Sequence, residues 1–341
     1  VYNLYINIKV SSMDLSLNNI TTQVNGKIDN NIQQHNLGDC GLISSVFSMA
    51  QTEDGAKNIE NSININNSNG EKSYDVTFKG INETYTISDS DIKNAQNNPE
   101  RQYSTGDDDM TLIELAVEKC LNETKNETVI SQKEDKLNGV SPNLVSYLFT
   151  GETGESVSYD KEKDLQSMMD VIQSTDTIYS NEDINLKDTD GNDIQLDKNK
   201  EYKVTSYNKD GSLEIESPKN FIFGGKKYTI SQEELFNSNF NNLKSNQDIT
   251  LEMIDDMFKE FENDKENTAL VFANMEDSDF SEIEDSNGEE ISLGSNHAYS
   301  VIDSNDDSVT LVNPWDTSEE ITINKEELFS LDSFKVYSPN V

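Results

Sequence analysis

The chain has only two histidines and two cysteines among its 341 residues, and one of each lies in a motif typical of nucleophilic chemistry. The cysteine motif is residues 34–41, QHNLGDCG, and the histidine motif is residues 296–301, NHAYSV. Asn313-Pro314-Trp315 follows, and it holds the only tryptophan. A thiol, an imidazole and an amide far apart in sequence are the three parts of a Cys-His-Asn site. A histidine base in this chain can therefore only be His297 or His35.

Cys40 comes directly before a helical pattern. Apolar residues recur there at spacings of three and four, at Leu42, Ile43, Val46, Phe47, Met49 and Ala50. This predicts Cys40 at a helix N-terminus, where the macrodipole and free N–H groups favour a thiolate. Gln34, on the loop that enters the helix, can place an amide donor beside the Cys40 N–H to bind an oxyanion. The alternative is a buried cysteine at the start of a core helix.

The histidine and asparagine motifs read as two neighbouring strands. Residues 298–303 and 308–312 have the alternating, β-branched pattern of strands, and the turn between them is residues 304–307. Antiparallel pairing brings His297 and Asn313 side by side, so the amide can orient the imidazole and hold its tautomer. Trp315 can shield that hydrogen bond from water. The alternative is a structural histidine and a strand that ends at a proline turn.

Together these motifs resemble the calpain-like branch of the papain-like cysteine peptidases. The matches are Asn31-Ile32-x-Gln34-x-x-Leu37-Gly38-Asp39-Cys40, then His-Ala-Tyr-Ser-Val from His297, then Asn-Pro-Trp from Asn313, in the order of the family. The resemblance implies an α+β, papain-like fold of two lobes. A helical lobe would carry Cys40, and an antiparallel β lobe would carry His297 and Asn313. It also implies Cys40 as nucleophile, His297 as base, Asn313 as orienting group and Gln34 as oxyanion donor.

The chain departs from this family at two places. Gly41 stands where the family has tryptophan, which removes one wall of the site and lowers the expectation of activity more than that of fold. Calpain cores bind calcium, and the resemblance implies a calcium site at Glu118 and Asn31. Asn31 replaces an aspartate of the family, which weakens that site by one charge. We therefore expect no required cofactor, with calcium as the one metal that the resemblance implies.

The patterns divide the chain into four segments, listed here in order: an N-terminal extension at 1–25, a helical lobe with Cys40 at 26–155, an inserted and mostly β module at 156–250, and a β lobe with His297 and Asn313 at 251–341. Helices are expected at 40–51, 110–123, 162–173 and 251–262, a hairpin at 73–87, and loops at 54–71 and 93–109. Residues 188–193 resemble a calcium loop, but a β-turn fits their glycine better.

The inserted module contains a sequence similar to that of the histidine motif. Residues 196–238 align with the strand pair around His297, with Lys200 in place of His297 and Ser217 in place of Asn313. We interpret this stretch as a non-catalytic repeat of the His-Asn hairpin. The alternative is that two unrelated β-meanders have converged on similar sequences.

The formal net charge is −39, from 65 acidic and 26 basic residues. Such a chain repels nucleic acid and anionic membranes, so neither is expected as a partner. We expect a monomer that acts on a protein or peptide. No apolar run approaches the ~20 residues that span a bilayer, and no signal peptide is visible. The location stays open between the cytoplasm and secretion without a recognisable signal, and Cys40 and Cys120 are expected as free thiols.

The sequence therefore predicts a cysteine endopeptidase of calpain type. The alternative function is an inactive relative that binds peptides or a partner. Two further readings stay open, which are acyl transfer to an amine by the same triad and a structural acidic protein loaded with calcium.

Overall fold

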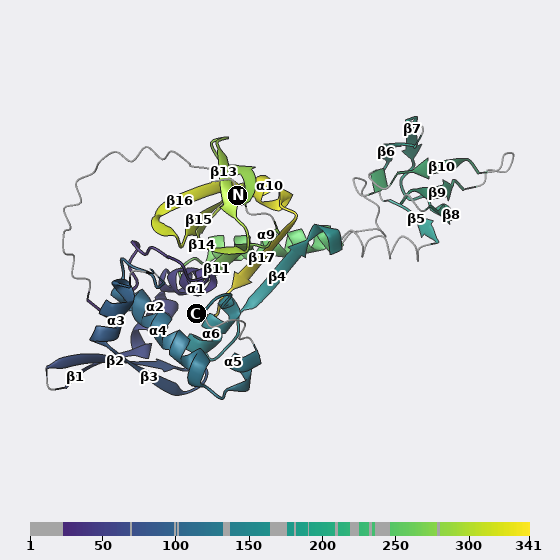
Figure 1. Cartoon of the computed structure of the whole chain (residues 1–341). Coiled ribbons are helices and arrows are strands. Elements are labelled where there is room, and N and C mark those ends of the chain that lie inside the picture. Colours follow the sequence, from purple (N-terminus) through teal and green to yellow (C-terminus); the bar gives the residue numbers. More distant parts are fainter. Residues whose placement is uncertain are drawn as a thin grey trace, which may run out of the picture.

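The computed structural model describes residues 23–341, apart from 69, 99, 101, 132–136, 164–175, 181, 190, 209–210, 219–224, 232–233, 236–245 and 278–279. Most of the predicted N-terminal extension and of the helix expected at 162–173 lies outside the described residues. Figure 1 shows a mixed α/β chain whose sheets are antiparallel. Buried side chains gather mainly into three hydrophobic cores, which belong to the N-terminal, middle and C-terminal parts of the chain.

Helices surround the first core. They are α1 (Cys40–Ala50), α2 (Glu53–Ser62), α3 (Asp89–Gln96), α4 (Asp108–Glu123), α5 (Glu127–Ser131) and α6 (Pro142–Thr150), with the sheet β1 (Ile63–Ser68), β2 (Glu71–Phe78) and β3 (Glu83–Ser88). The predicted hairpin at 73–87 is confirmed as β2 and β3. The loops expected at 54–71 and 93–109 are wrong in part, because these stretches contain most of α2, all of β1 and the end of α3.

Helix capping explains why those polar stretches are helical. Thr52 accepts the Gly55 N–H at the start of α2, and Ser88 forms a reciprocal capping box with Asp91 at the start of α3. Each helix buries only a few side chains, such as Ile59 in α2 and Ile92 in α3. Caps of this kind contribute about 1 kcal/mol each, which offsets a weak apolar face.

α1 is buried along nearly its whole length, from Gly41 to Met49. Its serines are tolerated in the core because their hydroxyls are hydrogen-bonded. Ser44 Oγ donates to the Ala298 carbonyl at 3.0 Å, and Ser48 Oγ donates to the Leu270 carbonyl at 2.8 Å. These bonds fix α1 against two strands of the C-terminal sheet.

The C-terminal sheet has six antiparallel strands in the order β16-β15-β14-β11-β17-β4. They are β4 (Glu155–Asp160), β11 (Leu270–Asn274), β14 (His297–Ser304), β15 (Ser308–Asn313), β16 (Asp316–Asn324) and β17 (Ser333–Ser338). A hairpin of β12 (Phe280–Glu284) and β13 (Glu290–Gly294), with α9 (Asn246–Asn263) and α10 (Lys325–Ser330), completes this part. β4 pairs with β17, so residues 156–160 belong to this sheet and not to the predicted inserted module.

The middle of the chain is a small β module. Its strands are β5 (Thr177–Ile178), β6 (Ile184–Lys187), β7 (Asp193–Leu196), β8 (Tyr202–Tyr207), β9 (Leu213–Glu216) and β10 (Lys227–Ile230). The module has a core of its own, built from residues 178–235. The turn predicted at 188–193 joins β6 to β7, and Gly191 has the positive φ of +81° that such a turn requires.

No helix among the described residues is long and apolar enough to cross a membrane.

Candidate active site

The N-terminus of α1 lies against β14, which brings the two predicted motifs together (Figure 1). Ser300 Oγ donates to the Ser44 carbonyl at 2.8 Å, and Ser44 returns a bond to the Ala298 carbonyl. The Cys40 side chain packs on Ala298 and its neighbours in the sheet. The thiol therefore lies beside the residue that follows His297.

His297 is held by Asn313 as the strand pair predicts. Its Nε2 lies 2.9 Å from Asn313 Oδ1. Because an amide oxygen only accepts, Nε2 must carry the proton, and Nδ1 keeps its lone pair as a base. Asn313 Oδ1 also accepts the backbone N–H of Trp315 at 3.0 Å, so the loop itself fixes the amide side chain of Asn313.

Two aromatic rings enclose the imidazole. The Trp315 ring lies over it with the centroids 4.3 Å apart and the planes at 33°, and Tyr299 meets it edge-on at 4.9 Å. His297 is only 5% exposed, whereas Trp315 is 45% exposed. Trp315 therefore separates the His297–Asn313 bond from solvent, as predicted from the sequence.

The Gln34 loop is tied to the Asn313 loop. The Gln34 backbone N–H donates to the Pro314 carbonyl at 2.8 Å, and Ile32 and Thr317 exchange hydrogen bonds nearby. The structure thus places the segment before Cys40 beside the segment after Asn313, although 279 positions, 313 minus 34, separate Gln34 from Asn313.

The Gln34 side chain does not present a free donor here. Its Nε2 donates to the Leu37 carbonyl and to Asp39 Oδ1, each at 2.9 Å. An amide NH2 has two hydrogens, so both are engaged. A role for Gln34 at an oxyanion requires one of these bonds to open when substrate binds.

Sequence reasoning missed the partner of Asp39, which is Glu114 on α4. Both carboxyl groups are fully buried, and they lie close enough for each to affect the pKa of the other. Burial raises the pKa of Asp39 to about 6 and holds that of Glu114 well above its ordinary value. The raised pKa favours a protonated Glu114, whose carboxyl group accepts hydrogen bonds from the Ser104 N–H and Oγ. One signal for this pair was a charged residue between the apolar Ile113 and Leu115 of a helix.

Glu114→Gln is expected to stabilise the protein at pH 8 and to have little effect at pH 5. A group with a raised folded-state pKa keeps its stabilising effect below the unfolded pKa and loses it as pH rises through the folded pKa. Glutamine copies the protonated form, since its NH2 can donate to Asp39 and its oxygen can accept from Ser104. Thermal unfolding at both pH values measures this. A lower melting temperature of Glu114→Gln at pH 8 would contradict the raised pKa of Glu114.

The pKa of the Cys40 thiol differs from the sequence prediction. Burial, followed by the nearby Asp39 carboxyl, raises the pKa of the Cys40 thiol, although Ala298 opposes this. Burial also lowers the pKa of His297, against the effect of Asn313. The expectation of a depressed Cys40 pKa is therefore wrong, because desolvation outweighs the helix dipole. Both shifts favour the neutral forms, a thiol at Cys40 and an uncharged imidazole at His297.

Gly41 has a packing reason. A Cβ at this position would lie 2.2 Å from the Val140 carbonyl oxygen and 3.5 Å from Pro142. The backbone that enters α6 thus occupies the space of a side chain. The glycine that replaces the tryptophan of the resembled family reflects this close approach, so it does not itself argue against activity.

The remaining predicted residues lie elsewhere. His35 Nε2 is 2.9 Å from Thr105 Oγ1, so it serves the loop before Cys40. Cys120 is buried within α4, and both cysteines are free thiols. Asn31 is exposed.

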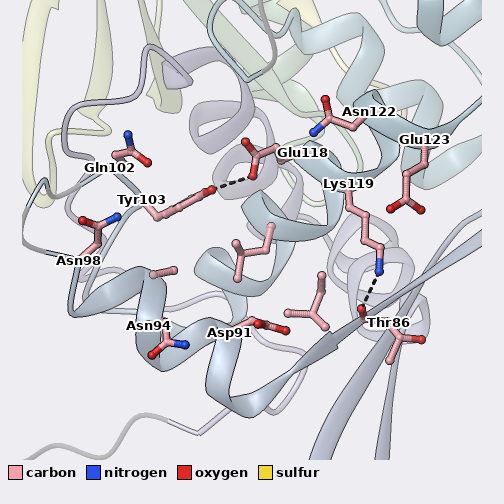
Figure 2. A pocket seen from close by; sticks show the side chains of 13 residues that line it. Thr86, Asp91, Asn94, Asn98, Gln102, Tyr103, Glu118, Lys119, Asn122 and Glu123 are labelled. Atoms are coloured by element: carbon pink, nitrogen blue, oxygen red, sulfur yellow. Dashed lines mark hydrogen bonds between the residues drawn. The ribbon is translucent and has the colours of Figure 1, made fainter.

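Glu118 lines a polar surface pocket of about 500 Å³ between α3 and α4, which Figure 2 shows. Its carboxylate accepts the Tyr103 hydroxyl at 2.7 Å. None of Cys40, His297 and Asn313 lines this pocket. The part of the chain that the structure describes holds no cluster of three His, Cys, Asp or Glu side chains suited to a metal. Calcium at Glu118 and Asn31 stays a prediction.

No protein-family model matches the chain, and no curated protein matches it either. Among solved structures, it is similar to an NlpC/P60 family protein from Bacillus cereus ATCC 10987 at 10% identity and a TM-score of 0.13. The match covers 39% of this chain and 37% of that one. A TM-score this low does not establish a shared fold, so the candidate site rests on the geometry of this chain alone.

Proposed function

We propose that the protein is a cysteine endopeptidase whose nucleophile is Cys40. The observation that carries this proposal is the His297–Asn313 pair under Trp315, beside the strand residue on which Cys40 packs. A thiol, a base with a fixed tautomer and an orienting amide are the groups that acyl transfer through a thioester needs. The substrate is a protein or peptide, and the protein acts as a monomer without a required cofactor. Calcium remains the one metal to test.

The reaction proceeds in two steps. Cys40 Sγ attacks the scissile carbonyl carbon while His297 Nδ1 takes the thiol proton, which forms a tetrahedral oxyanion. His297 returns that proton to the leaving amine, and a thioester remains on Cys40. Water then attacks the thioester with His297 as base, and the acid product and the thiol are released. Because the resting pair is neutral, proton transfer accompanies attack.

The oxyanion needs two donors. The first is the backbone N–H of Cys40, because N–H groups in the first turn of a helix lack intrahelical partners. The second is the Gln34 amide, once one of its bonds to Leu37 or Asp39 is released. The Asp39–Glu114 pair behind the loop positions Gln34 for this exchange.

The alternative function is an inactive relative that binds peptides or a partner. The raised pKa of Cys40 favours this alternative, since a thiol is a poorer nucleophile than a thiolate. Turnover of a fluorogenic peptide library, with wild type against Cys40→Ala, decides between the two. Turnover that Cys40→Ala abolishes supports the peptidase, and equal signals from both proteins exclude it. Mass spectrometry of products with an added amine distinguishes hydrolysis from acyl transfer.

Removal of the Gln34 and Asn313 side chains is expected to lower activity to different extents. Gln34→Ala removes one oxyanion donor and should lower kcat about 10²–10³-fold with little change in KM. Asn313→Ala should lower kcat less than His297→Ala does, because the imidazole can still reach Cys40 without its orienting group. Steady-state kinetics and thermal unfolding of both variants measure this. A Gln34→Ala protein that loses stability but keeps kcat would show a purely structural role for Gln34.

A further inference from the structure

The middle module repeats the arrangement of the C-terminal sheet. Its sheet has the order β10-β9-β8-β5, and the C-terminal sheet runs β16-β15-β14-β11 before its two outer strands. In each case a separate two-stranded hairpin, β6-β7 or β12-β13, follows the first strand of the repeat. Strands β5 to β10 therefore correspond one by one to β11 to β16.

The registers of the two sheets agree. Ile178 pairs with Tyr202 in the module, and Phe272 pairs with Tyr299 in the C-terminal sheet. The register then shifts between Val204 and Ser206, and at the corresponding place between Val301 and Asp303. A bulge at one shared position is a specific feature, because most strand pairs lack one there.

The backbone before each second sheet strand also agrees. Asn199 and Asn296, directly before Lys200 and His297, have φ of +56° and +49°. Few residues other than glycine adopt this conformation, so its recurrence at aligned positions is informative. In addition, the Tyr202 hydroxyl accepts the backbone N–H of Asp197 at 2.8 Å, and the Tyr299 hydroxyl accepts the backbone N–H of Gly294 at 2.8 Å. In both cases the donor lies five residues before the tyrosine.

The two hairpins contact their sheets at equivalent positions. Asp188, at the end of β6, bridges to Ile230, and Asp285, at the end of β12, bridges to Ile323. Gly191 and Gly288 occupy the following turns with φ of +81° and +78°. A meander alone explains the strand order, but it requires neither these bridges nor the matching bulge.

We infer that residues 176–235 are a second copy of the sheet that carries His297 and Asn313, folded as a unit of its own and silent in catalysis. The silence in catalysis rests on the proposed function, whereas the separate folding does not. The core of residues 178–235 includes no residue of the other two cores.

The copy has lost the reacting groups. Lys200 stands at the position of His297, and its ammonium pairs with Asp197 in an exposed salt bridge. Ser217 stands at the position of Asn313, and its hydroxyl accepts the Lys226 N–H at 2.8 Å. Neither side chain offers a base with a fixed tautomer.

The copy has also lost the surface that receives α1. In the C-terminal sheet that surface includes the buried Ala298 and Ser300. The corresponding residues in the module are Glu201 and Lys203, and both are exposed. Burying these charges under a helix would be costly, so the module does not take a cysteine-bearing helix in the same way.

Paired variants at the aligned positions test whether the module takes no part in catalysis. Lys200→Ala and Ser217→Ala are expected to leave kcat/KM within about twofold, since Lys200 is exposed, Ser217 is half-buried, and substitutions at the surface usually have small effects. His297→Ala and Asn313→Ala are the matched controls. A large loss of kcat in Lys200→Ala or Ser217→Ala, in protein that is still folded, would overturn the inference.

Hydrogen–deuterium exchange of the full chain tests the separate folding and needs no enzymatic activity. Ile215 and Leu311 are aligned, and each is fully buried. Ile215→Ala is expected to speed exchange within 176–235 and not in the C-terminal sheet, whereas Leu311→Ala is expected to speed exchange in the C-terminal sheet and α9 and not within 176–235. Ile215→Val and Leu311→Val serve if the alanine variants do not accumulate. Faster exchange in both regions from either variant would overturn the inference.

Discussion

His297→Ala is expected to lower kcat/KM by about 10³-fold or more, because removal of the base leaves only oxyanion stabilisation and binding. The proposed base is the imidazole of His297, which is buried and hydrogen-bonded to Asn313. Steady-state kinetics on the peptide that the wild type cleaves best measures the loss.

His35→Ala is the matched control, since it removes the other histidine of the chain. It should leave kcat/KM within about threefold, because His35 contacts Thr105 on the loop and has no assigned step. An inactive but folded His35→Ala protein, together with an active His297→Ala protein, would reverse the assignment.

Gly41→Ala is expected to be among the most damaging changes of a single methyl group. The new Cβ would lie 2.2 Å from the Val140 carbonyl oxygen, so α1 or the start of α6 must move. Overpacking of this kind costs about 1–3 kcal/mol, and a backbone clash lies at the upper end. Cys40 is the adjacent residue, and a displacement of about 1 Å in a reacting group can lower kcat about 10²-fold. Thermal unfolding and kinetics measure the two effects.

Gly38→Ala provides the comparison for Gly41→Ala. The nearest atoms to its Cβ belong to the Asn138 side chain, with Oδ1 at 3.1 Å, and a side chain can shift more easily than a backbone carbonyl. A smaller loss of stability and activity is therefore expected. If Gly41→Ala unfolded at the wild-type temperature with wild-type kinetics, close packing would not explain the glycine.

The parts of the fold that the sequence predicted are those with strong periodicity. The apolar spacing after Cys40 predicted α1, and the β-branched strands around His297 predicted the β14–β15 pair and its bond to Asn313. α2 was missed because its sequence, EDGAKNIENS, buries little and depends on the Thr52 cap. Local caps of this kind leave a weak signal beside the hydrophobic pattern.

The environment of Cys40 could not be predicted in the same way. Asp39 and Glu114 are 75 positions apart, 114 minus 39, and only the packing of α1 and α4 brings their carboxyls together. Burial raises the pKa of the Cys40 thiol, and helix position alone does not reveal it. The repeat over residues 196–238, by contrast, was visible in the sequence, and the structure added strands β5 to β7, the bulge and the backbone angles.

Labelling with an epoxide that alkylates catalytic thiolates tests the central claim, that Cys40 is a nucleophile served by His297. Intact mass and peptide mapping at pH 7 should show one adduct, on Cys40, in wild type and His35→Ala. His297→Ala should remain unlabelled while folded, and Cys120 should stay unmodified in all three proteins because it is fully buried within α4, out of reach of the reagent and without a neighbouring base. An adduct on Cys120 in place of Cys40, or equally fast labelling of Cys40 in His297→Ala, would contradict the account.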